Sequence, residues 1–79
     1  MLVTTNNPFE FRGVSTRATD KGTYHYANFE NEDGNPMQVY VGKSSDMVSD
    51  LEKGDMCLLT FDYNQYYKSM NLKAVEMVG

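Results

Sequence analysis

Residues 23–42 show the most regular alternation of polar and apolar side chains in the chain. Two alternating runs flank a turn-rich segment, Glu32-Asp33-Gly34-Asn35-Pro36, and this combination predicts a β-hairpin. Successive side chains on a strand point to opposite faces, so the apolar residues of both runs can share one face against a core. That face carries His25, Ala27, Phe29, Met37, Val39 and Val41.

The opposite face of the predicted hairpin is rich in tyrosine. It carries Tyr24, Tyr26, Asn28, Gln38 and Tyr40. Three tyrosines on a solvent-exposed face are more than solubility requires. This face is therefore the main candidate for a binding surface.

The length of the hairpin loop follows from the same alternation. Odd-numbered residues of both strands share the core face only if the residue numbers of each opposed pair add to an even value. A loop with an odd number of residues meets this condition, so we expect three or five residues in the loop. In such a loop Gly34 or Asn35 adopts a positive φ, and Pro36 lies just outside the ladder. Tyr26 then lies opposite or diagonal to Tyr40, close enough for a continuous aromatic surface.

Residues 9–19 predict the strand that precedes this hairpin. Phe9 and Phe11 lie on one face, and from Val14 the apolar face changes side. Gly13 lies at that change, and a glycine inside a strand indicates a bulge or a sharp bend.

The neighbouring segments are shorter. Residues 1–8 predict an arm or a short edge strand, and Asp20-Lys21-Gly22 is a hairpin-turn signal. Residues 43–54 break the alternation and carry a short apolar stripe before Gly54, which predicts one or two helical turns.

Two strands are expected after that insert. Residues 55–63 predict a strand whose apolar first half is buried on both faces. Asn64-Gln65 predicts a tight turn, and residues 66–78 predict the last strand, with Leu72 and Ala74 facing the core.

We therefore expect residues 1–79 to form one all-β domain with the order β-β-β-(short helix)-β-β. A small sheet avoids exposed edges by closing into a barrel. Five strands with a short helix between the third and the fourth resemble an OB-fold.

Two motifs add to this resemblance. Leu51-Glu52-Lys53-Gly54-Asp55 is similar to the Lys-Gly-Asp start of the fourth strand in bacterial single-stranded-DNA-binding proteins. Tyr66-Tyr67-Lys68-Ser69-Met70-Asn71-Leu72 is similar to the start of their last strand. The size and the tyrosine-bearing hairpin also resemble the small single-stranded-DNA-binding proteins of phages and plasmids. Bacterial members carry a flexible acidic tail, but this chain ends at Gly79, so the role of that tail is not carried over.

The resemblance implies binding of single-stranded DNA, with RNA as an alternative, during replication or transfer of a phage or mobile element. In OB-folds the ligand usually crosses the second and third strands, between the first–second and fourth–fifth loops. Aromatic rings stack on bases and cations contact phosphates, without strong sequence preference. The implied contact residues are Tyr24, Tyr26, Tyr40, Gln38, Arg17, Lys21, Lys43, Tyr63, Tyr66 and Lys68. Of the adjacent pair Tyr66 and Tyr67, one is expected to point inward.

The charge balance opposes a simple polyanion binder, because the formal net charge is -4. Most of the acidic residues lie between Glu30 and Asp62, however. Fields around a protein are local within about 8–10 Å, so a basic groove can exist on an acidic body. The cations outside the acidic window are Arg12, Arg17, Lys21, Lys68 and Lys73. The alternative function is a protein-interaction module that uses the tyrosines or a sheet edge.

Catalytic and metal chemistry find little support. His25 shares its face with apolar residues, and Cys57 lies in an apolar strand. No second cysteine or histidine is present to complete a zinc site or a disulfide. We therefore expect a non-enzymatic protein without cofactor or metal, soluble in a reducing cytoplasm, with no membrane segment. Because small domains often gain stability from oligomerisation, a homodimer is an alternative to the monomer.

Overall fold

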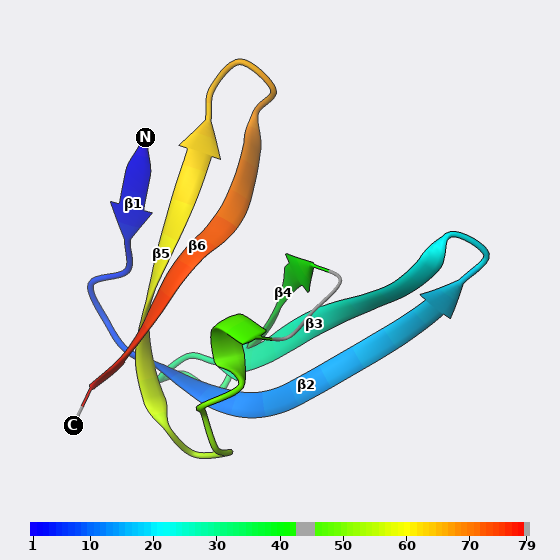
Figure 1. The fold of residues 1–79 in the computed structure, drawn as a ribbon. Coiled ribbons are helices and arrows are strands. Elements are labelled where there is room, and N and C mark those ends of the chain that lie inside the picture. Colours follow the sequence, from blue (N-terminus) through cyan, green and yellow to red (C-terminus); the bar gives the residue numbers. More distant parts are fainter. Residues whose placement is uncertain (43–45, 79) are drawn as a thin grey trace.

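The structure is a computed structural model in which residues 1–42 and 46–78 are described. The chain is all-β, as the sequence predicts, and every strand pairing is antiparallel. The strands are β1 (Leu2–Thr4), β2 (Phe9–Thr19), β3 (Gly22–Glu30), β4 (Pro36–Gly42), β5 (Met56–Asn64) and β6 (Ser69–Val78) (Figure 1). The N-terminal segment forms the short edge strand β1, so the sheet has six strands instead of five.

The strands form two antiparallel units that share a base. β2, β3 and β4 follow one another in a meander, while β5 pairs with β6, β1 and the start of β2. The β2–β3 and β5–β6 hairpins leave this base in different directions (Figure 1). Among the described residues no ladder joins β4 to β6, so the predicted closed barrel is not confirmed.

The predicted bulge in β2 is present. The β2–β3 register shifts between Phe11 and Gly13, and Gly13 has a φ of 110°. Phe11 lies opposite Phe29 before the bulge, and Val14 lies opposite Ala27 after it. Phe11 is buried before the bulge, whereas Val14 is 41% exposed after it, where the strand bends away from the core.

The β3–β4 register agrees with the expectation that the numbers of opposed residues add to an even value. Glu30 is paired with Pro36 and Tyr26 with Tyr40, which leaves a five-residue loop in which Gly34 has a φ of 83°. The side chain of Asn31 fixes this loop, because its Oδ1 accepts hydrogen bonds from the backbone N–H groups of residues 33 and 35 at 2.9 Å each. The prediction for Pro36 is wrong, since it is the first residue of the ladder, a position where a missing N–H is tolerated.

The core lies where the two units meet. The Phe11 and Phe29 rings are 5.6 Å apart between centroids, and Cys57 and Leu59 from β5 are fully enclosed. The buried set is Phe11, Ala27, Phe29, Val48, Cys57, Leu59 and Leu72.

The predicted short helix is not confirmed. In the described part of the segment, one 3-10 turn, η1 (Asp46–Val48), places Val48 in the core. Lys43, which the sequence suggests as a phosphate contact, lies outside the described residues.

The prediction that Ala74 faces the core is also wrong. The β5–β6 register shifts between Thr60 and Phe61, where β6 accommodates Lys73 as an extra residue. Leu72 is buried before this bulge and Val75 packs against the core after it, whereas Ala74 is exposed.

Candidate functional site

The pairing of β2, β3 and β4 assembles one aromatic surface on the side away from the core. Tyr26 lies between Ser15 of β2 and Tyr40 of β4, and Tyr24 lies opposite Arg17. The Tyr40 ring is 6.0 Å from that of Tyr24 and 5.6 Å from that of Tyr26. We call the surface formed by Ser15, Arg17, Tyr24, Tyr26, Asn28, Gln38 and Tyr40 the tyrosine face.

The three rings are neither stacked flat on one another nor buried. Tyr40 is inclined by 54° to Tyr24 and by 56° to Tyr26. Tyr40 is 45% exposed, and the other two rings are half-buried. Tilted pairs at this spacing are a favourable arrangement of aromatic rings, so the three tyrosines support one another on this face.

A chain of hydrogen-bonded polar groups borders the rings. Gln38 Nε2 donates to Asn28 Oδ1 at 2.9 Å, and Asn28 Nδ2 donates to Ser15 Oγ at 2.8 Å. The three side chains come from three adjacent strands, so the bonds hold the strands in register and keep the amides in place beside the tyrosines.

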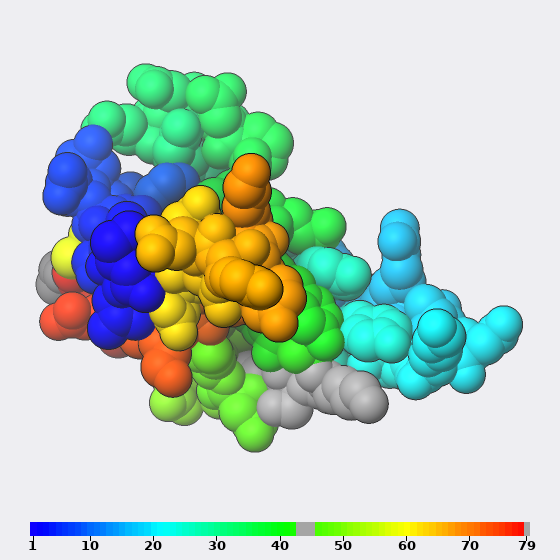
Figure 2. Space-filling model, turned by 90° about the horizontal axis from the view of Figure 1, so that it is seen from above, coloured from blue at the N-terminus to red at the C-terminus, as the bar shows by residue number. Residues whose placement is uncertain are grey.

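Two of the predicted contact cations come from β2 and from the turn that follows it. Arg17 is exposed opposite Tyr24, and Lys21 lies in the two-residue turn between Thr19 and Gly22. This end of the β2–β3 hairpin stands clear of the rest of the molecule (Figure 2). In the described part of the chain neither cation forms an ion pair, so both charges remain available to a ligand.

Arg12 is different from these two cations because it is already neutralised. Its guanidinium lies 2.7 Å from a carboxylate oxygen of Glu10 and 3.8 Å from one of Glu30. The hydrogen bond and charge of Glu10, with the charge of Glu30, raise the pKa of Arg12.

Sequence analysis missed one cation beside the face. The Lys53 side chain lies against Gly13, where its Cε is 3.0 Å from the position of a Cβ built on that glycine. The sequence motif placed Lys53 only at the start of the next strand. Two backbone bonds that join Gly54 and Asp55 to Phe11, at 2.9 and 2.8 Å, bring its loop against β2.

The other predicted contacts lie on the β5–β6 hairpin. Four residues, 65–68, join its two strands. Asn64 Oδ1 accepts hydrogen bonds from the backbone N–H groups of Tyr66 and Tyr67 at 3.0 and 3.2 Å, and Lys68 has a φ of 52°. The predicted tight turn at Asn64-Gln65 and the inward tyrosine are therefore wrong. Both rings are outside, 84% and 74% exposed, with centroids 5.1 Å apart.

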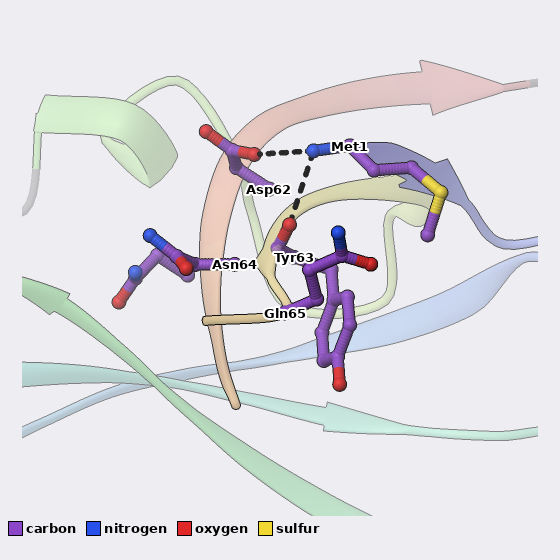
Figure 3. Close-up of a pocket in the computed structure, with 6 residues that line it drawn as sticks. Met1, Asp62, Tyr63, Asn64 and Gln65 are labelled. Carbon is purple, nitrogen blue, oxygen red and sulfur yellow. Dashed lines mark hydrogen bonds and ion pairs between the residues drawn. The ribbon is translucent and has the colours of Figure 1, made fainter. Parts of the chain in front are cut away.

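Tyr63 is separate from both aromatic groups. It lines a polar cavity of about 460 Å³ at the base of this loop (Figure 3). The Met1 ammonium donates there to Asp62 Oδ1 at 3.3 Å and to the Tyr63 carbonyl at 3.0 Å. Among the described residues, no ring contact or hydrogen bond joins Tyr63, Tyr66 or Lys68 to the tyrosine face.

The titratable groups of the core lie elsewhere. His25 is half-buried on the core side of β3, and its Nδ1 is enclosed without a hydrogen-bond partner in the described structure. Burial, with a smaller contribution from the charge of Asp55, raises the pKa of the Cys57 thiol. In residues 1–42 and 46–78, no cluster of three or more His, Cys, Asp or Glu side chains could hold a metal ion.

Comparison with protein-family models, curated proteins and solved structures finds no significant match. Within the described residues there is also no helix with the length and apolar character needed to cross a membrane.

Proposed function

We propose that this chain is a non-enzymatic protein that binds single-stranded DNA with little sequence preference. The proposal depends mainly on one observation, the cluster of Tyr24, Tyr26 and Tyr40. The ring centroids of Tyr24 and Tyr26 lie 6.0 and 5.6 Å from that of Tyr40. Every base has a π-face, so a tyrosine surface accepts any sequence, and each stacked base contributes about 1–3 kcal/mol.

The charges beside the rings support the same function. Arg17 and Lys21 form no ion pair in the described structure; Arg17 lies opposite Tyr24, and Lys21 lies at the tip of the same hairpin. Sequence-independent binding of single strands combines stacking with cations that track the backbone. Coating of exposed strands during replication or transfer of a mobile element is the role that the resemblance suggests.

The strand order supports an OB-fold interpretation. An OB barrel has the same order of neighbouring strands: β2, β3 and β4 on one side, and β6, β5 and β2 on the other. Among the described residues, no pairing between β4 and β6 closes the barrel. In that fold the tyrosine face corresponds to the usual oligonucleotide-binding face.

The proposal is tested with two double variants. Tyr26→Ala/Tyr40→Ala removes two rings, and the matched control Tyr26→Phe/Tyr40→Phe keeps the rings but removes the hydroxyls. Fluorescence anisotropy of labelled oligo-dT should show a loss of affinity of roughly tenfold or more for the alanine variant only. Urea unfolding checks that both variants fold. Wild-type affinity in a folded alanine variant would overturn the proposed stacking surface.

A second candidate function, a protein-interaction module, is favoured by the tip of the β5–β6 hairpin. Tyr66, Tyr67 and Met70 are 84%, 74% and 53% exposed there. Aromatic and methionine side chains are enriched in protein interfaces. This function becomes the leading one if wild-type protein does not bind oligo-dT.

A further inference from the structure

We infer that the phosphate backbone of the bound strand runs lengthwise along β2, from Lys53 at the bulge, past Arg17, to Lys21 at the hairpin tip. This inference rests on the proposed function. It adds Lys53 to the interface and assigns the bases to the tyrosines of β3 and β4.

The position of Lys53 is the first support. Its Cε and Nζ lie 3.0 and 4.0 Å from the site of a Gly13 Cβ, so the lysine occupies space that a side chain at this position would fill. Gly13 is paired with Asn28, whose amide belongs to the polar chain on the tyrosine face. The glycine therefore permits a cation from a distant loop to lie at the β2 side of that face.

The carboxylates near Lys53 leave its charge unpaired. Asp55 turns its Oδ2 into its own loop, where it accepts the backbone N–H of Glu52 at 2.8 Å. No ion pair of Lys53 is present among the described residues. Glu10 and Glu30 are taken up by Arg12, which is why Arg12 is not part of the proposed line.

The spacing along the strand fits an extended nucleic acid. A strand rises about 3.3 Å per residue, so Gly13 and Arg17 are roughly 13 Å apart. Lys21 lies beyond Arg17, in the turn that follows Thr19. Tyr24 and Tyr26 are about 7 Å apart by the same rule, roughly twice the 3.4 Å rise of stacked bases. With one base stacked on each tyrosine, successive phosphates are about 7 Å apart. Cations about 13 Å apart along β2 then contact every second phosphate.

The distribution of charge favours β2 over β4 as the phosphate side. β4 (Pro36–Gly42) contains no charged residue. Beyond Phe11, β2 has no strand on its outer edge in the described structure. Such an edge exposes backbone N–H groups, which are common phosphate donors alongside Lys and Arg.

The test compares single-charge variants by their salt dependence. Lys53→Ala, Arg17→Ala and Lys21→Ala are titrated with labelled oligo-dT across a salt series, and the control is Lys73→Ala, an exposed lysine on β6. Each of the first three should reduce the log–log salt slope by about 0.7 and weaken binding about five- to tenfold at 0.05 M salt. Lys53→Arg should keep the wild-type slope, and Lys73→Ala should leave both quantities unchanged.

The outcomes separate the two proposals. If the DNA instead crosses the β2–β3 hairpin, Arg17→Ala weakens binding. Lys53 and Lys21 lie at opposite ends of the proposed line, so at least one of Lys53→Ala and Lys21→Ala then leaves binding unchanged. That result overturns the lengthwise path and leaves the proposed function standing. If the wild-type protein does not bind oligo-dT at low salt, the proposed function fails and the path fails with it.

Discussion

Tyr40 joins the other two tyrosines of the face, since its ring contacts both Tyr24 and Tyr26 while coming from a different strand. Its side chain is 45% exposed, whereas those of Tyr24 and Tyr26 are half-buried. A base can stack on Tyr40 without any rearrangement of the core, because the hydrophobic cluster lies on the other side of β4. The proposed ligand binding and the folding of the core therefore depend on different faces of the same strands.

At the residue scale, Cys57 provides a test of the core. Its side chain has no exposed area, so a water-soluble thiol reagent can reach it only when the structure opens. We expect native protein at neutral pH to react at least about a hundredfold more slowly than urea-unfolded protein, as measured by absorbance of the released thiolate. Equal rates in the two states would contradict the enclosed position of this thiol.

The pH dependence of stability follows from the same residue. Burial raises the pKa of the Cys57 thiol, so the folded state retains a proton that the unfolded state loses. The resulting stabilisation is fully present below the ordinary thiol pKa of about 8.5 and is lost as the pH rises through the folded-state pKa. The stability difference between wild type and Cys57→Ala should therefore narrow above about pH 8.5.

At the element scale, the bulge in β2 depends on Gly13, whose φ of 110° is unfavourable for any side chain. Gly13→Ala should destabilise the fold by about 1–3 kcal/mol in urea unfolding. Gly22→Ala is the matched control, because Gly22 has a φ of 131° but no atom within 4 Å of an added Cβ. The Gly13 variant should be the less stable of the two, since its methyl group must also displace Lys53. Equal or higher stability than the control would contradict the close packing of Lys53 on the bulge.

The elements that sequence analysis predicted are those governed by local rules. Alternation with period two predicted a loop of three or five residues, with Tyr26 opposite or diagonal to Tyr40; the structure has five residues and a direct Tyr26–Tyr40 pair. A glycine inside a strand predicted the bulge at Gly13. These signals lie within β2, β3 and β4, which follow one another along the chain, and need no knowledge of the rest of the fold.

The features that were missed depend on contacts that no local pattern encodes. The β5–β6 loop is set by the Asn64 side chain and by a non-glycine residue, Lys68, with a φ of 52°. The bulge at Lys73 lacks a glycine or proline, so Ala74 was assigned to the wrong face. Lys53 lies against Gly13 only because its loop packs against β2, far away in the sequence.

At the scale of the whole molecule, the net charge of -4 and the proposed ligand are reconciled by the distribution of charge. Arg17 on β2, Lys21 in the turn after β2 and Lys53 beside Gly13 form no ion pair in the described structure. Charges farther away than about 8–10 Å are largely screened at physiological salt, so a local line of cations can dominate the field felt by a strand. Binding should consequently weaken steeply as salt is added.

The most direct test of the account is a titration of the intrinsic tyrosine fluorescence with oligo-dT at several salt concentrations, since the chain contains no tryptophan. The account predicts saturable quenching by bases stacked on the tyrosine face, with a log–log salt slope of about −2 for three phosphate contacts. Unchanged fluorescence at low salt, with no binding detected by a labelled strand, would contradict the central claim that this face binds single-stranded DNA.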